Sequence, residues 1–398
     1  MTAIEDDRAA RPPRIALYRN PRARSVFVQA LVVMLLFWLG WELVANARSN
    51  LAAKGVISGF GFLDDSAGFD VSQALIPYSP ADSYRRLYLV GLLNTLLVAV
   101  LGIILATILG FVIGIARLSG NWLVARIAGG YVELIRNLPL LFQLLFWYLA
   151  VLGTLPATRE SLSVFGAIFL NNRGVVLPRP ILGDGASSVV LAFLIALFAV
   201  WALRRWTRRR QAATGKTLKI FWPGLLLLIG LPFVVLVATG FPIGFELPEL
   251  RGFNFVGGWR VIPEFTALLI GLVVYTAAFI AETVRGGILA VSRSQSEAAY
   301  ALGMPRRRTM RLIVIPQALR VIIPPLTSHY LNLTKNSSLA VGIGYPDLFA
   351  VFAGTALNQT GAQAIEIIAI TMATYLALSL ITSALMNFYN ARLRLVER

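Results

Sequence analysis

Residues 294–316 of the chain read SQSEAAYALGMPRRRTMRLIVIP. Ser294 stands three residues before Glu297, which is the spacing of a capping box at a helix N-terminus, and Gly303 is of the residue type that most often ends a helix. The stretch therefore predicts a short amphipathic helix over residues 294–303. Exposed apolar side chains on such a short helix suit a hydrophobic groove of a partner protein.

The rest of the chain has the composition of a membrane protein. Of its 398 residues, 57% are hydrophobic and only 14% are charged, and the mean hydropathy is +0.73. A soluble surface is roughly a quarter to a third charged, so an ordinary soluble domain is excluded. Cysteine is absent, which excludes disulfides, cysteine-bound metals and a thiol nucleophile.

Apolar stretches long enough to cross a bilayer, which takes about 20 residues per helix, recur along the chain. We predict an all-α polytopic membrane protein with about eight transmembrane helices. The second of them carries small residues at steps of four from Gly102 to Gly114, which predicts close packing inside a bundle. The predicted spans are Phe27 to Ala45, Tyr88 to Ala116, Ile127 to Leu152, Ser188 to Leu203, Ile220 to Gly240, Phe265 to Ala290, Leu312 to Leu331 and Gly361 to Tyr389.

The distribution of charge predicts the orientation in the membrane. The formal net charge is +17, and arginine and lysine crowd residues 8–24, 204–219 and 306–311, whereas carboxylates such as Asp64 and Glu246 stand in the opposite loops. Because cytoplasmic loops carry the excess of cations, both termini are expected in the cytoplasm. The N-terminal apolar run is longer than a usual secretory signal, so we expect an uncleaved first helix.

The opening stretch resembles the signature of a known family. The pattern Glu-Ala-Ala, three residues, Gly, nine residues, Ile, one residue, Leu, Pro is similar to the coupling helix of permease subunits of bacterial binding-protein-dependent ABC importers. The matching residues are Glu297, Ala298, Ala299, Gly303, Ile313 and Pro316, with Ile315 in place of the leucine. The resemblance implies that this helix docks into a cleft of a cytosolic ATPase subunit and transmits its closure to the transmembrane helices.

Further stretches look like those of polar amino-acid permeases. They are GLLNTL at 91–96, RNLPL at 136–140, YTAAFIAETVRGG at 275–287 and KNSSL at 335–339. With residues 69–80 and the long insert, the chain looks most like the Q-type subunit of general L-amino-acid importers. The resemblance implies a type I importer permease core of five helices in the bacterial inner membrane. Its implied partners are a periplasmic amino-acid-binding protein, a second permease subunit, and an ATPase dimer that binds ATP and Mg, with no cofactor in this chain. The residues alone leave open whether the second permease is another copy of this chain or a distinct sister, and the resemblance favours the sister.

This resemblance divides the chain into segments. We expect a cytoplasmic basic N-terminus at 1–26, the first transmembrane helix at 27–45, a periplasmic segment at 46–87, core helices at 88–152, an insertion with two extra helices and a basic cytoplasmic loop at 153–263, core helices at 264–390 with the coupling helix at 294–303, and a cytoplasmic tail at 391–398. The role of the first and the inserted helices stays open. For the basic loop, the usual cytoplasmic charge bias is favoured over attraction to anionic lipid headgroups.

Polar side chains at membrane depth are costly and mark candidate contacts along the substrate path. An amino acid presents a carboxylate and an ammonium group, so we expect Lys335 or Arg136 to favour the carboxylate. The amide and hydroxyl groups of residues 336–338 would supply hydrogen bonds. The candidates are Arg136, Asn137, Glu282, Arg285, Lys335, Asn336, Ser337 and Ser338.

Some of these polar positions are equally consistent with structural roles. Pro139 is expected to interrupt the third span and free backbone groups that could line a cavity. Glu282 and Arg285 lie three residues apart on one helix face, which fits a structural ion pair equally well. His329 is expected to form an interhelical hydrogen bond.

The chain alone is not expected to be an enzyme, because it shows no paired carboxylates in a soluble cleft, no histidine cluster and no Ser-His-Asp arrangement. Gly215-Lys216-Thr217 imitates the end of a phosphate-binding loop, but Arg210 stands where the loop glycine belongs. A proton-coupled secondary amino-acid transporter is the alternative function, and Glu282 is nearly its sole candidate for an acid relay. A scaffold without transport would leave the coupling-type helix unexplained. The amino acids carried, and whether this subunit or its sister holds them, stay open.

Overall fold

The computed structural model describes residues 21–53, 59–215, 220–360 and 363–393. Seven helices in these ranges are long and apolar enough to cross a membrane, and the bent pair α3 and α4 brings the number to eight. The prediction of a polytopic helical protein with about eight spans is therefore confirmed. The helices that carry the fold are α1 (Pro21–Ala53), α2 (Tyr84–Ala116), α3 (Trp122–Asn137), α4 (Leu140–Leu145), α5 (Ala186–Thr214), α6 (Phe221–Ala238), α7 (Pro263–Leu289), α10 (Ile315–Asn336) and α12 (Ala364–Leu393).

Short helical turns connect or extend these helices. The seventh predicted span belongs to one nearly continuous helical path that runs from α9 through α10 to the end of η6. The short elements are η2 (Gly61–Asp64), η3 (Phe146–Leu152), η4 (Thr158–Glu160), α8 (Arg293–Ala301), α9 (Arg306–Thr309), η5 (Met310–Val314), η6 (Ser337–Ile343), η7 (Phe349–Ala356) and α11 (Leu357–Thr360).

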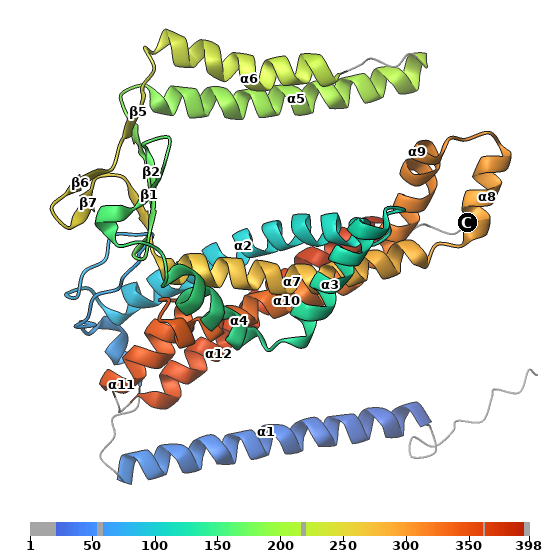
Figure 1. Cartoon of the computed structure of the whole chain (residues 1–398). Helices are drawn as coiled ribbons and strands as arrows, with labels where there is room; N and C mark the ends of the chain where they lie inside the picture. The colour runs from blue at the N-terminus through green and yellow to red at the C-terminus, as the bar shows by residue number, and fades with distance from the viewer. Residues whose placement is uncertain (1–20, 54–58, 216–219, 361–362, 394–398) are drawn as a thin grey trace, which may run out of the picture.

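Helices α2 and α7 form the centre of a bundle, and α3, α10 and α12 pack around them (Figure 1). The small-residue face of α2 meets α7 directly. A Cβ atom added to Gly110 would lie 2.6 Å from Cβ of Ile280, and one added to Gly114 would lie 2.7 Å from the carbonyl oxygen of Ala281. These distances leave no room for a side chain, so the predicted close packing of this helix is confirmed.

Adding a methyl group at this contact should separate the two central helices. We expect Gly110→Ala to destabilise the protein by about 1–3 kcal/mol, the usual cost of overpacking a core. Thermal unfolding in mild detergent measures the change. Gly286→Ala is the matched control, because nothing lies within 4 Å of the added methyl group there. Equal unfolding temperatures for Gly110→Ala and the control would contradict the contact.

The third predicted span, Ile127 to Leu152, is not one straight helix, because α3 and α4 are bent by 109° where they meet. Pro139 has no N–H group and favours extended backbone in the residue before it, and Leu138 has φ −99° and ψ 133°. The Gln143 side-chain amide donates to the carbonyl oxygens of Ile135 (2.9 Å) and Leu138 (3.0 Å), which satisfies groups that the break frees. The interruption expected at Pro139 is confirmed, and the single straight span is corrected to a bent pair.

Residues 153–263 contain the two predicted extra helices and also strands that the sequence did not predict. Helices α5 and α6 pack against each other as a hairpin that stands away from the bundle, as α1 does on another side (Figure 1). The strands lie at the end of the bundle where α7 begins. Each has only three or four residues, too few for an alternating pattern to be recognised in the sequence.

All strand pairs in this insert are antiparallel. The largest sheet has the order β1-β2-β3-β8, and two hairpin-like pairs, β4 with β5 and β6 with β7, lie beside it. In the four-stranded sheet Val176 stands opposite Phe169 on one side and Arg260 on the other. The strands are β1 (Leu162–Val164), β2 (Ile168–Asn171), β3 (Gly174–Leu177), β4 (Arg179–Leu182), β5 (Ile243–Glu246), β6 (Glu249–Arg251), β7 (Asn254–Val256) and β8 (Trp259–Val261).

The described part of the segment between α1 and α2 folds against the start of α2. The buried ring of Phe62 on η2 lies against the rings of Tyr84 and Phe352, whose centroids are 5.9 and 6.4 Å away. This contact joins the segment to both α2 and η7 in one apolar cluster.

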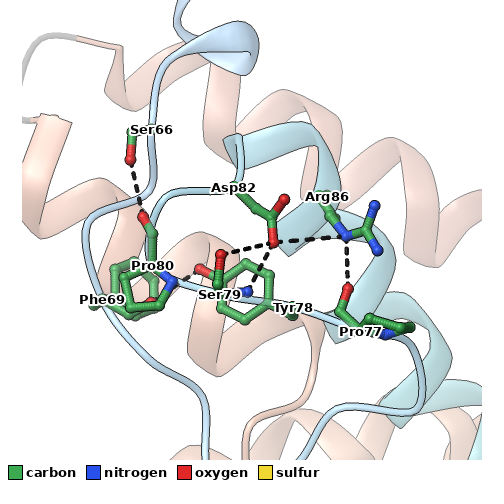
Figure 2. A network of polar contacts seen from close by, with 8 residues as sticks. All are labelled: Ser66, Phe69, Pro77, Tyr78, Ser79, Pro80, Asp82 and Arg86. Carbon is green, nitrogen blue, oxygen red and sulfur yellow. Dashed lines mark hydrogen bonds and ion pairs between the residues drawn. The ribbon is translucent and has the colours of Figure 1, made fainter.

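Hydrogen bonds hold the same segment in a compact loop, which Figure 2 shows. The Tyr78 hydroxyl donates to the carbonyl oxygen of Phe69 (2.9 Å), and the backbone N–H of Ser79 donates to the Asp82 carboxylate (2.7 Å). Burial, with the nearby Asp82 as a smaller cause, raises the pKa of Tyr78 to about 12. The hydroxyl therefore stays a neutral donor at physiological pH, and the loop does not depend on a titration there.

Candidate functional site

The short helix of the opening stretch is present as α8 and lies at one end of the molecule, outside the bundle (Figure 1). Its start differs from the prediction. The N-cap is Ser292, no side chain caps the first turn, and the hydroxyl groups of Ser292 and Ser294 are bonded to each other at 2.6 Å. The predicted capping box of Ser294 with Glu297 is therefore wrong.

The end of α8 is where the sequence predicts it. Gly303 has φ +75°, a backbone conformation that residues other than glycine rarely adopt. Its N–H donates to the carbonyl oxygen of Tyr300 (2.9 Å), and the N–H of Met304 donates to that of Ala299 (3.0 Å). These two bonds form a Schellman motif, which turns the chain sharply towards α9.

One face of α8 packs on the molecule and the other faces outwards. Ala299 is buried against the turns that lead into α10, where Thr309 and Val314 are buried too. Glu297 and Ala298 are both exposed, and Leu302 has 83% of its surface exposed. The helix thus presents an apolar and acidic face to whatever lies beyond this end of the bundle.

The remaining two residues of the signature lie behind this helix rather than on it. Ile313 belongs to the π-helical turn η5, and Pro316 is the second residue of α10, directly after this turn. They are part of the connection through which a movement of α8 would reach α10.

A cavity of about 330 Å³, lined mostly by polar side chains, lies between α7 and α10 and opens to the surface, where Ser328 and Asn332 are exposed. It is hereafter called the α7–α10 cavity. The Arg136 guanidinium, from the last turn of α3, lies 5.1 Å from the centre of the Phe279 ring on its wall. The cavity therefore offers amide, hydroxyl and imidazole groups, with the Arg136 guanidinium in contact with one of its lining rings. Its lining residues are Tyr275, Thr276, Phe279, Ser328, His329, Asn332 and Asn336.

The structure brings some of the predicted path residues together and separates others. Arg136 and Asn336 converge on the α7–α10 cavity, whereas Lys335 and Ser338 line a second cavity of about 320 Å³ against η7 and α12. Ser337 is fully buried and its hydroxyl donates to the carbonyl oxygen of Thr334. Asn137 is exposed at the end of α3.

Several residues of the α7–α10 cavity were not singled out from the sequence as substrate contacts. Ser328, Asn332 and Asn336 follow one another at steps of four on α10, a helical period that could have indicated one polar face. His329 Nε2 lies 2.9 Å from the Thr283 hydroxyl on α7, so its predicted interhelical hydrogen bond is confirmed.

Glu282 forms ion pairs with two arginines, one more than the sequence suggested. Its carboxylate accepts hydrogen bonds from Arg285 on the same helix, at 2.6 and 3.2 Å, and from Arg117 at the end of α2. All three side chains are at least two-thirds buried. The cluster ties the same ends of α2 and α7 together, which is a structural role.

Removing the negative charge of this cluster should loosen the two helix ends. We expect Glu282→Gln to lower the unfolding temperature by several degrees, because the two arginines then lie partly buried without a counter-charge. Glu133→Gln, at an exposed carboxylate on α3, is the control and should unfold like the parent. Thermal unfolding in detergent compares them. A Glu282→Gln variant as stable as the control would show that the ion pairs contribute nothing.

A second polar cluster, which was not identified from the sequence, holds the turn after α10. The Asp347 carboxylate accepts hydrogen bonds from the Tyr375 hydroxyl (3.0 Å) and the backbone N–H of Ala350 (2.8 Å). Asn94 donates to the carbonyl oxygen of Pro346 at 2.8 Å. Through these bonds the turn is fixed to both α2 and α12.

A helical bundle with a broken span, a cavity lined mostly by polar side chains and an amphipathic helix outside the bundle define a membrane permease that receives its movement from a partner. The model of the family described as binding-protein-dependent transport system inner membrane component matches residues 100–395. The chain belongs to this family.

Three similar proteins match nearly the whole chain. The general L-amino acid transport system permease protein AapQ of Rhizobium johnstonii is 52% identical over 385 residues, 97% of this chain and 96% of that protein. The putative amino-acid ABC transporter permease protein YhdX of Escherichia coli is 51% identical, covering 96% and 97%. The glutamate/glutamine/aspartate/asparagine transport system permease protein BztB of Rhodobacter capsulatus is 45% identical, covering 98% and 99%.

Membership of this family fixes the general role of the chain. It is an inner-membrane permease of an ABC importer, which works with an ATPase in a separate subunit and with a substrate-binding protein. The chain is therefore not an enzyme, and the alternative of a proton-coupled transporter is excluded.

Proposed function

We propose that this chain is one permease subunit of an ATP-driven importer of amino acids. The observation that carries the proposal is the 52% identity with AapQ over nearly the full length of both chains, since that protein is a general L-amino acid permease. The α7–α10 cavity supports it, because an amino acid needs a cation for its carboxylate and acceptors for its ammonium group.

Within this proposal, α8 is the coupling helix. Glu297 and Ala298 on its outward face would enter a cleft of the cytosolic ATPase, and Gly303 would set the angle at which the helix leaves that cleft. Ile313 and Pro316 would carry the movement into α10 and hence to the α7–α10 cavity. ATP and Mg would be bound by the ATPase dimer alone.

The remaining partners and the orientation follow from the same proposal. A periplasmic amino-acid-binding protein would deliver the substrate, and a distinct sister permease would complete the path. Both termini would be cytoplasmic. In support of this orientation, the first turn of α1 and the last turn of α12 lie at the end of the molecule that carries α8 (Figure 1).

The two cavities allow a choice among the predicted substrate contacts. Arg136 is at the α7–α10 cavity and Asn336 lines it, so the proposed path assigns the substrate carboxylate to Arg136 and a hydrogen bond to Asn336. Lys335 and Ser338 belong to the cavity beside α12, a face that the sister permease could cover. The side chain of Ser337 is bonded within its own helix.

Loss of the Asn336 amide should impair transport without impairing assembly. We expect Asn336→Ala to reduce amino-acid uptake about tenfold, the effect of one hydrogen bond to a charged group, while the complex still assembles. Uptake by proteoliposomes that contain the whole importer measures it. Asn387→Ala, at an exposed asparagine of α12, is the control. If Lys335→Ala reduces uptake and Asn336→Ala does not, the path lies along the other cavity.

The coupling role of α8 can be tested at Gly303, two residues after the end of the helix. Gly303→Val should weaken association with the ATPase strongly, because valine does not tolerate φ +75° and the end of the helix must change. Gly303→Asn should bind the ATPase nearly as the parent does, because asparagine tolerates this conformation and no atom lies within 4 Å of the added Cβ. Co-purification from mild-detergent membranes gives the result. Recovery of as much ATPase with the valine variant as with the parent would contradict the proposed coupling role of α8.

A further inference from the structure

The last third of α5 gathers four arginines on one side of the helix. They are Arg204, Arg205, Arg208 and Arg209, hereafter the arginine face, and all four are exposed. Because 204 and 208, like 205 and 209, are four residues apart, their side chains are neighbours on the helix surface. Together with Trp201 they line a cavity of about 440 Å³.

The arginine face has no anionic partner in the part of the chain that the structure describes. None of its four guanidinium groups forms an ion pair with a described carboxylate. The contacts that are present come from aromatic rings, with Arg205 5.8 Å from the centre of the Trp201 ring and Arg210 5.3 Å from that of Trp206. The positive charge of this surface is therefore available to an external anion.

The length of α5 places the arginine face at the membrane surface. The apolar part of the helix, residues 186–203, spans about 27 Å at 1.5 Å per residue, which is close to the roughly 30 Å of the hydrocarbon core. Arg204 therefore begins at the level of the lipid headgroups. Trp201, Trp206 and Trp222 are exposed around it, as tryptophans are at membrane interfaces.

We propose that the arginine face and Trp201 form a binding site for the phosphate headgroup of an anionic phospholipid. The lipid belongs to the leaflet on the side of α8, because the end of α5 with the arginines lies at that end of the molecule (Figure 1). Guanidinium groups bind phosphate oxygens through paired hydrogen bonds, and the indole ring covers the acyl chain just below the headgroup.

Two observations favour a lipid over an ordinary loop charge bias and over an acidic protein partner. The charge bias of cytoplasmic loops accounts for cations anywhere in a loop, but these four share one side of a regular helix and line one cavity. An acidic protein partner would need no exposed tryptophans at the same depth. The bilayer, in contrast, always supplies both an anion and an apolar chain at this level.

The proposal can be tested by lipid retention. The purified chain in its complex would be placed in nanodiscs of phosphatidylcholine with a minor fraction of phosphatidylglycerol, and native mass spectrometry would count the phosphatidylglycerol that stays bound. Replacing the arginine face by glutamine (R204Q, R205Q, R208Q, R209Q) should lower this retention about fivefold or more. The control variant R173Q, R179Q, R251Q, R260Q removes four exposed arginines at the opposite end, three in strands and one in the β2–β3 turn, and should retain the lipid as the parent does.

A second variant controls for the case in which loss of all four arginines disturbs membrane insertion. R205Q with R209Q leaves Arg204, Arg208 and Arg210 to fix the orientation, and it should lose part of the retention while the complex assembles normally. Equal retention by all variants would overturn the proposal. So would a loss of the ATPase at unchanged lipid retention, which would assign the surface to a protein, or equal stabilisation of the parent by inorganic phosphate alone, which would assign it to a soluble anion.

Discussion

The contact between α2 and α7 is the constraint on which the rest of the bundle depends. At Gly110 and Gly114 the two backbones approach as closely as two helices can, and in a bilayer such small-residue contacts replace the hydrophobic effect as the source of association. Once α7 is fixed on one side by α2, its other side is left for α10, and the α7–α10 cavity forms between them. The ion pairs of Glu282 hold the same two helices directly beside this contact, at the C-terminal end of α2.

A second constraint is that no backbone polar group can be left without a partner inside the membrane. The break at Pro139 frees carbonyl groups, and the side chain of Gln143 returns to bond two of them. Side chains also bond backbone groups in the turn after α10. Asn94 donates to the carbonyl oxygen of Pro346, and the Asp347 carboxylate accepts from the backbone N–H of Ala350. In both irregular segments, therefore, polar side chains form hydrogen bonds with backbone groups.

The residues that could be predicted from the sequence are those whose effect is local. The end of α8 at Gly303 and the interruption at Pro139 follow from the backbone preferences of single residues, and the spans follow from apolar length. The start of α8 was predicted wrongly, because Ser292 and Ser294 bond to each other and neither bonds to the first turn. The strands of the insert were not predicted from the sequence, in part because pairs such as β4 with β5 join residues that are far apart in the chain.

The two cavities on either side of α10 show the limit of sequence reasoning most clearly. Lys335 and Asn336 are neighbours in the chain and were expected in one pocket, yet a rotation of about 100° per residue on α10 sends them to different cavities. Which side of a helix faces a path is decided by the helices packed around it. The sequence was enough to name these residues as candidate substrate contacts, but only the packing of the helices assigns them to different cavities.

Helix α1 stands apart from the bundle, and none of its apolar window is buried. It is also the first of the described helices to leave the ribosome. A segment that needs no partner within its own chain can enter the membrane and be held there before any of the later helices has been made. Its independence suits it to biogenesis, because its own folding waits for no segment that follows it.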